Sequence, residues 1–416
     1  MTIGIDFGTS NTVVSVKQAG KSIVLSLGED GEITPSLMFF EADGRLSIGN
    51  EARCDYARAL SGTGDLSRKF RFFQGLKFAL RDQYFSGTKL FGKRWTIEQL
   101  VGAFLMEIRK NTEEAIGGSS DLVILGLPVK LSADPAAENA LSQRYNDACA
   151  LAGYDNIRFV REPVAAMNSI ASKGDGIRLV FDFGGGTLDI TVADIRNGKP
   201  VVLANAGTDL GGYHLNEDIS RARIIRHFGY GSAFKTMTGK LLEIPAWVTN
   251  QVASFYALPL ADIVHTRATV KDLLHEARDR KKLLALIDFL DRNLAYELFE
   301  KIDDGEIALS SRDLVSIGFA VLPHLKFEEQ ISMAEFEVIA NPRVAAAKAL
   351  ILEAVDAAGI YVDDVEAVVR VGGSSRIPVF TRMLEGLFPG RVSEGAIFTS
   401  ISAGLIDAYE NGLEVT

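Results

Sequence analysis

Residues Leu179 to Val192 read LVFDFGGGTLDITV: an apolar run, three consecutive glycines and then an alternating apolar run. Such runs are typical of β-strands, so the pattern predicts a strand, a tight glycine turn and a second strand. Because glycine has no Cβ, the amides of Gly184 to Gly186 can approach a ligand and form a concave group of N–H donors. A P-loop or a dinucleotide fingerprint would open a helix instead. The pattern therefore predicts a different class of phosphate site.

The same order recurs near the N-terminus, where Ile3 to Val16 read IGIDFGTSNTVVSV. Asp6 and Asp182 thus end two similar strands that lie far apart in the chain, which suits one hairpin in each of two similar lobes. A third glycine turn, VVRVGGSSRIP at Val368 to Pro378, follows a strand and leads into an expected helix from Val379 to Phe388. A single glycine turn is most often structural, but three of them favour a nucleotide site.

Size and composition set limits on the fold and on the partners. The chain has 416 residues, of which 47% are hydrophobic, and single cores stop growing near about 250–300 residues, so two domains are expected. A net charge of −10 argues against binding to nucleic acid or to an anionic membrane, because positive charge supplies most of that affinity. Cys54 and Cys149 show no CxxC spacing, so no disulfide framework or cysteine-ligated metal is predicted. With no membrane-length apolar run and no space for a signal peptide before the first strand, we expect a cytoplasmic protein.

The three glycine turns resemble the phosphate-one, phosphate-two and adenosine motifs of the actin, sugar kinase and heat-shock chaperone superfamily. The residues of these motifs are most similar to those of the DnaK-type heat-shock chaperones. Further matches are REPVAA at Arg161 to Ala166, GTDLGG at Gly207 to Gly212 and SISAG at Ser400 to Gly404. The resemblance therefore covers nearly the whole chain.

This resemblance implies an α/β fold of two actin-like lobes, each built on a ribonuclease-H-like mixed five-stranded sheet, with ATP or ADP and Mg²⁺ in the cleft. We expect lobe I at residues 1–173, with an inserted subdomain at about 34–95. Lobe II is expected at residues 174–392, with an inserted helical subdomain at about 213–340. Residues 393–416 would form a helix that crosses the hinge and returns to lobe I. The small-residue helices Val164 to Ala171 and Ser400 to Tyr409 resemble the family's hinge pair.

The resemblance also implies which residues bind the nucleotide. The phosphates would be held from opposite sides by Gly8, Thr9, Ser10 and Asn11 and by Gly184, Gly185, Gly186 and Thr187. The floor of the site and the border of the adenosine would be formed by Gly211, Gly212, Gly372, Gly373, Ser374 and Arg376. Asp6 and Asp182 would hold Mg²⁺, largely through waters, because Mg²⁺ keeps much of its hydration shell.

Four residues are candidates for catalysis: Glu162, Asp182, Lys77 and Asp189. An acidic residue at the position of Glu162 is favoured by the helix dipole alone, but the family uses a glutamate there to place the attacking water or the waters of Mg²⁺. The family also places a lysine of the inserted subdomain at the γ-phosphate. Lys77 matches its position best, with Lys69 as the rival. The surrounding stretch, RKFRFFQGLKFALR, is typical of RNA-binding segments too, but in an acidic chain we expect it to pack its Phe and Leu side chains inward.

Two regions depart from the family pattern. Pro128 matches a proline credited with relaying the nucleotide state, but Ala136 stands where the family has its partner arginine. The stretch DDGEIALS at Asp303 to Ser310 occupies the place of the adenosine clamp Glu-x-x-Lys-Arg-x-Leu-Ser, with Glu306 for the lysine and Ile307 for the arginine. We therefore expect weak ATP binding and poor discrimination of adenine from guanine, unless Lys301 or Arg312 takes over the vacant role.

The sequence ends at Thr416, from which we expect no peptide-binding domain and a closest likeness to short, YegD-like members of the family. The expected function is that of an ATP-binding, ATP-hydrolysing conformational switch that acts on an unidentified protein partner. Three alternatives stay open: an actin-like filament protein, a small-molecule kinase, which would need a carboxylate base beside an acceptor pocket, and a reactivating factor for another enzyme.

Overall fold

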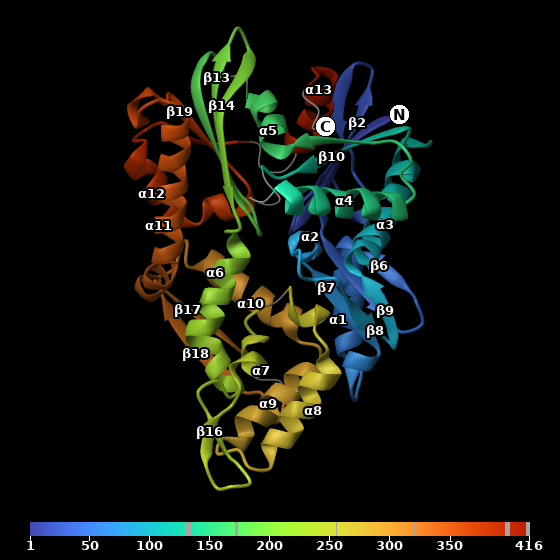
Figure 1. Cartoon of the computed structure of the whole chain (residues 1–416), viewed down its shortest axis with the longest axis vertical. Helices are drawn as coiled ribbons and strands as arrows, with labels where there is room; N and C mark the ends of the chain where they lie inside the picture. The colour runs from blue at the N-terminus through green and yellow to red at the C-terminus, as the bar shows by residue number, and fades with distance from the viewer. Residues whose placement is uncertain (130–134, 171–173, 255, 320–321, 396–399, 413–416) are drawn as a thin grey trace.

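The computed structural model describes residues 1–129, 135–170, 174–254, 256–319, 322–395 and 400–412. Figure 1 shows two α/β lobes side by side, lobe I mostly blue to teal and lobe II mostly green to orange, with the red helix α13 (Ser400–Glu410) beside the strands of lobe I. The exact boundaries of the lobes stay a prediction. No helix in the described ranges is both long enough and apolar enough to cross a membrane.

Lobe I is built on a mixed sheet with the strand order β11-β10-β1-β2-β3. These strands are β1 (Thr2–Phe7), β2 (Asn11–Gln18), β3 (Lys21–Val24), β10 (Leu122–Leu127) and β11 (Ile157–Arg161). The short β4 (Thr34–Pro35) pairs with β2 as a sixth strand, which the sequence did not indicate. β1 runs antiparallel to β2 and parallel to β10, and its Ile3, Ile5 and Phe7 are fully buried. α3 (Ile97–Ile116) and α4 (Pro135–Leu151) pack together on this lobe.

Lobe II repeats the plan with a five-stranded sheet in the order β14-β13-β12-β19-β20. Its strands are β12 (Gly176–Phe183), β13 (Leu188–Arg196), β14 (Lys199–Thr208), β19 (Ala367–Val371) and β20 (Val392–Glu394). β12 and β13 form the predicted hairpin around the three glycines, and β19 lies parallel to β12. α11 (Met333–Ala357) and α12 (Pro378–Leu387) pack against each other beside this sheet, and Pro378 begins α12 as expected. The two lobes therefore present equivalent strand ends to the space between them.

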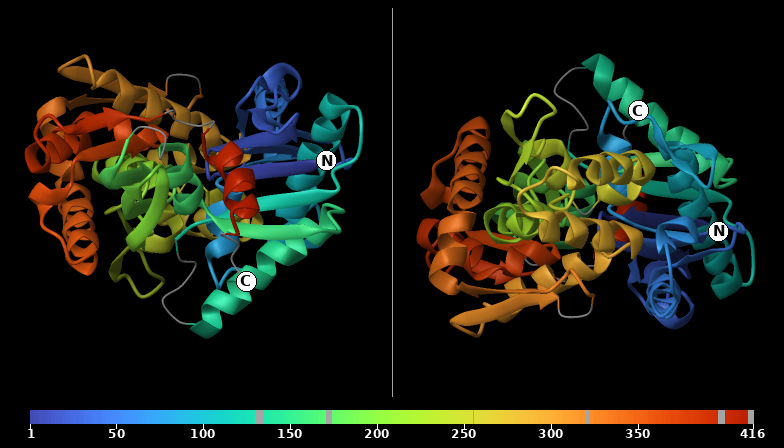
Figure 2. Two further views of the ribbon diagram at one scale, coloured as in Figure 1. Left: turned by 90° about the horizontal axis from the view of Figure 1, so that it is seen from above. Right: turned by 90° about the horizontal axis from the view of Figure 1, so that it is seen from below.

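Two helices of small residues join the lobes. α5 (Glu162–Ile170) and α13 (Ser400–Glu410) pack against each other, and α13 also contacts β1, β2 and β10. A Cβ at Gly404 would overlap the carbonyl oxygen of Ala165, so only glycine allows this crossing. Figure 2 shows α13, in red, next to the blue strands of lobe I.

The insertion in lobe I contains the small sheet β6-β5-β7 and the hairpin β8-β9. Its elements are β5 (Leu37–Glu41), β6 (Leu46–Ile48), α1 (Gly49–Leu60), β7 (Phe70–Gln74), α2 (Leu76–Arg81), β8 (Gly87–Leu90) and β9 (Lys93–Thr96). The basic and aromatic stretch is thus split between β7 and α2. Phe70, Phe72, Phe73 and Leu80 are at most 2% exposed, which confirms the packing interpretation.

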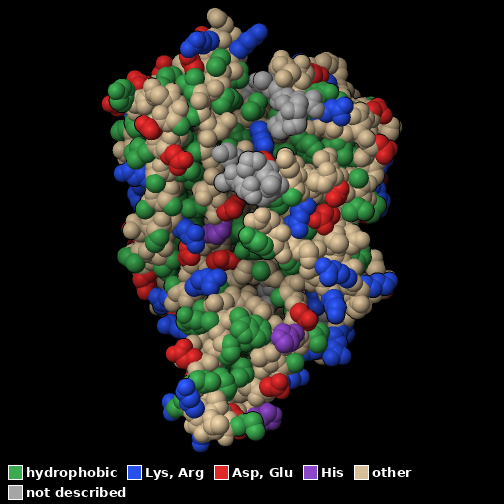
Figure 3. Space-filling view, viewed as in Figure 1, with side chains coloured by type: hydrophobic (Ala, Val, Ile, Leu, Met, Phe, Trp, Pro, Cys, Tyr) green, Lys and Arg blue, Asp and Glu red, His purple; other side chains and the backbone are tan. Residues whose placement is uncertain are grey.

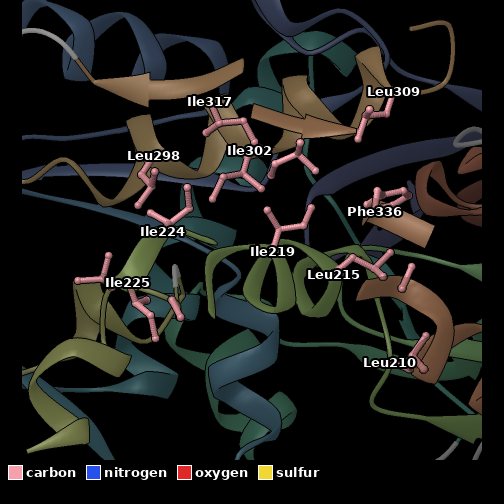
Figure 4. Close-up of a cluster of buried hydrophobic side chains, with 14 of the residues drawn as sticks. Leu210, Leu215, Ile219, Ile224, Ile225, Leu298, Ile302, Leu309, Ile317 and Phe336 are labelled. Carbon is pink, nitrogen blue, oxygen red and sulfur yellow. The ribbon is translucent and has the colours of Figure 1, made fainter. Parts of the chain in front are cut away.

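The insertion in lobe II is mostly helical but also contains two hairpins that the sequence did not indicate. Its elements are α6 (Gly212–Ile219), β15 (Ala233–Lys235), β16 (Leu241–Glu243), α7 (Ala246–Asn250), α8 (Ile263–Leu274), α9 (Arg280–Asp291), α10 (Ala295–Ala308), β17 (Leu314–Phe319) and β18 (Phe327–Ser332). Figure 4 shows Leu215 and Ile219 of α6 facing Ile302 of α10 and Phe336 of α11 across one apolar cluster. This cluster fixes α6 and α10 at the edge of the cleft.

Candidate nucleotide site

A cavity of about 610 Å³ lies where the hairpin turns of both lobes meet α2, α10 and the turn after β19. Most of the predicted site residues line it: Asp6, Gly8, Thr9, Ser10, Asn11, Lys77, Glu162, Asp182, Gly184, Gly185, Thr187, Gly212, Gly372, Gly373, Ser374 and Arg376. The cavity therefore gathers residues from both ends of the chain into one site.

The two hairpin turns are closed in the same way. The amide of Gly8 donates to the carbonyl of Asn11 at 2.9 Å, and the amide of Gly184 donates to that of Thr187 at 3.0 Å. In the described part of the chain, the amides of the two residues that follow each glycine have no acceptor: Thr9 and Ser10 in lobe I, and Gly185 and Gly186 in lobe II. Successive unpaired amides in a turn form an anion-binding nest.

The turns also touch each other across the cleft. A Cβ at Gly185 would overlap Ser10 Oγ, so a side chain there would push the turns apart. The carbonyls of Gly184 and Gly185 accept hydrogen bonds from the amides of Gly212 and Tyr213 at 3.1 and 2.9 Å, which ties the second turn to the start of α6. The Tyr213 ring and Ser10 both lie against Gly185, and burial raises the pKa of the Tyr213 hydroxyl to about 12. Sequence reasoning missed this tyrosine, because nothing in its position indicated a contact with the opposite lobe.

Carboxyl groups gather beside the turns. Asp6 is the last residue but one of β1, Asp182 is the last but one of β12 and lies opposite Asp189 on β13, and Glu162 begins α5. Burial and then the charge of Glu162 raise the pKa of Asp6 to about 7 and that of Asp189 to about 6. Burial, followed by the charges of Asp189, Glu162 and Asp6, also raises the pKa of Asp182. Four carboxyl groups, of which Glu162 and Asp189 are buried and Asp6 and Asp182 partly buried, favour a bound cation.

Lys77 supplies positive charge to this cluster. Its Nζ lies 2.6 Å from Glu162 Oε1, and the two side chains are only 6% and 10% exposed. Burial alone would lower the pKa of Lys77, but Glu162, Tyr145 and Asp6 outweigh it and raise that pKa. The rival Lys69 donates instead to the carbonyl of Thr63 at 3.2 Å on the exposed surface. Lys77 is therefore the lysine of the cleft.

The residues fit Mg²⁺ held through waters. Within the described ranges, no three His, Cys, Asp or Glu side chains come close enough together to ligate one ion directly. Mg²⁺ usually keeps several waters and is bound by one or two carboxylates together with phosphate oxygens. Asp6 and Asp182, one from each lobe beside the two amide nests, match that requirement.

The free energy of unfolding of the metal-free protein should fall as pH rises from about 4 to 7. The folded state keeps a proton on Asp189 up to its pKa of about 6 and on Asp6 up to its pKa of about 7, while the unfolded chain releases both near the ordinary value of 3.8. Each proton that the folded state retains lowers the free energy of unfolding by up to about 1.4 kcal/mol for each pH unit of the rise. Urea denaturation in EDTA measures the slope, which Asp6→Asn should reduce and which added Mg²⁺ should offset at high pH. A flat profile in the wild type would contradict the buried cluster.

The far end of the cavity is the place expected for adenosine. The turn after β19 has Gly372 at φ +81°, a conformation that favours glycine, and Ser374 lies against Gly212. α10 contributes Asp303, Glu306, Ile307 and Ser310 to the same cavity. The altered clamp therefore does border the cleft. Lys301 lies 3.8 Å from Glu297, and neither Lys301 nor Arg312 is among the described residues that line the cavity.

Some predicted residues lie behind the cavity wall. Gly186 and Gly211 are buried, and a Cβ on Gly211 would overlap the carbonyl of Gly185, so both glycines shape the turn itself. Asp189 is 6% exposed, and it lies next to the site because it pairs with Asp182 across the β12–β13 hairpin. The side chain of Ala136 lies outside the described residues. An arginine nonetheless reaches Pro128: Arg161 donates to its carbonyl at 2.8 Å and contacts Glu138 at 2.8 Å.

The face seen in Figure 3 carries acidic and basic side chains interspersed over both lobes, with no continuous basic region.

Comparisons with known proteins agree with this architecture. The family model described as Hsp70 protein matches residues 2–235 and 271–396. The chaperone protein dnaK1 of a Nostoc species is 24% identical over 97% of this chain and 54% of its own length. Chaperone protein DnaK of Thermus thermophilus is 24% identical over 92% of this chain and 56% of its own length, and that of Picrophilus torridus is 26% identical over 95% and 55%.

The chain spans about half the length of these curated relatives. The family model, however, covers most of the chain, including all three glycine turns. The chain therefore belongs to the Hsp70 protein family.

Proposed function

We propose that this protein binds ATP·Mg between its lobes, hydrolyses it, and uses the resulting conformational change to act on a protein partner in the cytoplasm. The observation that carries the proposal is the pair of opposed glycine turns, each with two unpaired amides, beside a buried carboxyl cluster. Backbone amides in such turns bind phosphate oxygens, and carboxylates bind the accompanying cation.

The residues divide the chemistry between them. The amides of Thr9, Ser10 and Gly185 would fix the phosphates, so that the reacting group is held in one orientation. Lys77 would stabilise negative charge as it develops on the transferred phosphoryl oxygens. Glu162, which Lys77 holds at 2.6 Å, would accept a hydrogen bond from the attacking water and so aim it. Mg²⁺, when bound, would neutralise negative charge on the phosphates.

The phosphate-binding groups belong to both lobes, and this division is the basis of the proposed conformational switch. Thr9, Ser10 and Lys77 belong to lobe I, whereas Gly185 and Tyr213 belong to lobe II. A phosphate chain held by both sets favours the closed arrangement of the lobes, and loss of the terminal phosphate removes part of that preference. Arg81 of α2 adds a contact of 2.8 Å to Asp209 before α6. A partner that prefers one arrangement would then respond to the nucleotide.

The proposal is tested by thermal and urea denaturation with ATP·Mg, ADP·Mg and no ligand, together with phosphate release. A ligand at 100 times its dissociation constant should add about 2.7 kcal/mol to the free energy of unfolding. Affinity isolation in ATP and separately in ADP should then retain different proteins. Absence of any stabilisation by millimolar ATP·Mg would refute the function, and ATP-dependent sedimentation would point to a filament instead.

A further inference from the structure

One histidine lies beside the glycine turn of lobe II and has no use in the proposed phosphate chemistry. The imidazole Nδ1 of His214, in the first turn of α6, accepts a hydrogen bond from the Gly211 amide at 3.0 Å. In return, the His214 amide donates to the Gly211 carbonyl at 3.0 Å. In a capping box of this kind the side-chain acceptor is usually a glutamate or glutamine. Here a group that can gain a proton near neutral pH takes that place.

Gly211 connects this histidine to the phosphate turn. A Cβ at Gly211 would overlap the carbonyl of Gly185, and the two amides that follow Gly211 donate to the carbonyls of Gly184 and Gly185 at 3.1 and 2.9 Å. The start of α6 and the turn are therefore packed backbone against backbone. A shift of Gly211 would move Gly185, which lines the cavity and has an unpaired amide among the described residues.

Burial and the charges around the ring together favour its neutral form. Asp209 precedes α6 and is paired with Arg81 of α2 at 2.8 Å, while Asp218 of α6 is paired with Arg343 of α11 at 2.7 Å. Both carboxylates thus already have a cationic partner. Burial and then the charge of Arg343 lower the pKa of His214 from its ordinary value of 6.5, although the two aspartates act in the opposite direction. Folding therefore opposes protonation of this ring.

Protonation would remove the contact with Gly211. Nδ1 accepts the Gly211 N–H only while it carries no proton itself, so the neutral ring has its proton on Nε2. A proton on Nδ1 would bring two N–H groups face to face, and the helix dipole opposes positive charge in the first turn of a helix. The ring also packs against Phe78 of lobe I, with the ring centroids 5.5 Å apart, so a displaced ring would alter a contact between the lobes.

On the basis of the proposed function, we propose that neutral His214 is a positioning residue, which holds Gly211 against the glycine turn of lobe II and so fixes the Gly185 amide for phosphate binding. Protonation of Nδ1 releases Gly211, and ATP·Mg binding becomes weaker as pH falls. The two binding equilibria are linked, so bound ATP·Mg opposes protonation of His214.

The sign of this linkage distinguishes positioning from simple proximity. A histidine that only lies near the phosphates gains a proton more easily when they bind, because negative charge favours the imidazolium and raises its pKa. A histidine that must be neutral to position the turn shows the opposite shift. The pKa of His214 with and without nucleotide therefore separates the two roles.

The first measurement is the pKa of His214 in the full chain, from NMR spectra of labelled histidine recorded in Mg²⁺ between about pH 5 and 8, with and without ATP. The chain has five histidines, and His214→Asn assigns the signal because one resonance disappears. We expect ATP to lower the pKa of His214. A raised or unchanged pKa would overturn the inference.

The second measurement is calorimetric titration with ATP·Mg at about pH 8 and about pH 5. His214→Asn places Oδ1 where Nδ1 lies, so it keeps an acceptor for Gly211 but does not titrate. His214→Leu removes the acceptor at every pH. The matched control is His275→Asn, at an exposed position at the end of α8.

The wild type should bind ATP·Mg as tightly as His214→Asn at the higher pH and about tenfold more weakly at the lower pH, within the usual range of coupling between two sites. The titration of Asp6 and of the nucleotide itself cancels in this ratio. His214→Leu should bind about tenfold more weakly than His214→Asn at both pH values. His275→Asn should follow the wild type throughout.

A ratio of wild-type to His214→Asn affinity that does not change with pH overturns the inference, while the proposed function stands as long as ATP·Mg binds. Equal binding by His214→Leu and His214→Asn would also overturn it, because Gly211 would then need no acceptor. The comparison of the wild type with His214→Asn does not depend on the folding of His214→Leu. Failure of the wild type to bind ATP·Mg at the higher pH overturns both the inference and the proposed function.

Discussion

Gly184→Val is expected to weaken ATP·Mg binding at least 100-fold, about 2.7 kcal/mol, without loss of folding. Gly184 lines the cavity, and the nearest protein atom to a Cβ built there is Thr187 O at 3.9 Å, so the added side chain enters the space that the phosphates need. Calorimetric titration gives the affinity, and urea denaturation gives the free energy of unfolding.

The matched control is Gly118→Val, because a Cβ at Gly118 meets no atom within 4 Å and lies outside the cavity lining. Gly185 and Gly211 are less suitable positions. Side chains there overlap Ser10 Oγ and the carbonyl of Gly185, so a loss of binding would be mixed with a distortion of the turns. Wild-type affinity in Gly184→Val would exclude the second glycine turn as the phosphate site.

Lys77→Met should slow ATP turnover by about 10²–10³-fold, the usual effect of removing one stabilising group from developing charge. It should also destabilise the metal-free protein by about 3–5 kcal/mol, since it leaves Glu162 buried without its partner at 2.6 Å. Single-turnover phosphate release and urea denaturation measure the two effects separately.

The double variant Lys77→Met with Glu162→Gln distinguishes catalysis from structural support. It replaces a buried ion pair with two uncharged groups of similar shape, so most of the lost stability should return. Turnover should stay low, because neither the charge nor the acceptor is restored. Recovery of turnover together with stability would show that the pair only holds α2 against α5.

The hairpins and the hinge helices could be predicted because their signals are local. Three glycines between two apolar runs specify a strand, turn and strand, and the small residues around Gly404 already implied a close helix crossing, which its contact with Ala165 confirms. β7 gave no such signal. Phe70 and Phe72 are buried on one side of it and Phe73 on the other, so the alternation that marks a half-exposed strand is missing.

The residues of the candidate site also differ in whether a local sequence signal could identify them. Residues in the glycine turns could be placed because the turns themselves form the cavity wall. The pairing of Lys77 with Glu162, the approach of Tyr213 and Ser10 to Gly185 and the burial of Glu306 depend on elements that meet only in the folded chain. Sequence spacing carries no information on such distances, which is why Lys77 and Lys69 stayed rivals until the fold was known.

Hydrogen–deuterium exchange at the two glycine turns tests the central claim most directly. Thr9, Ser10 and Gly185 line the cavity and their amides have no acceptor among the described residues, so they should exchange readily in the free protein. ATP·Mg should protect peptides that contain both turns, with Gly184→Val as the variant that loses the protection. Binding of ATP·Mg that leaves exchange at both turns unchanged would place the nucleotide elsewhere and contradict the account.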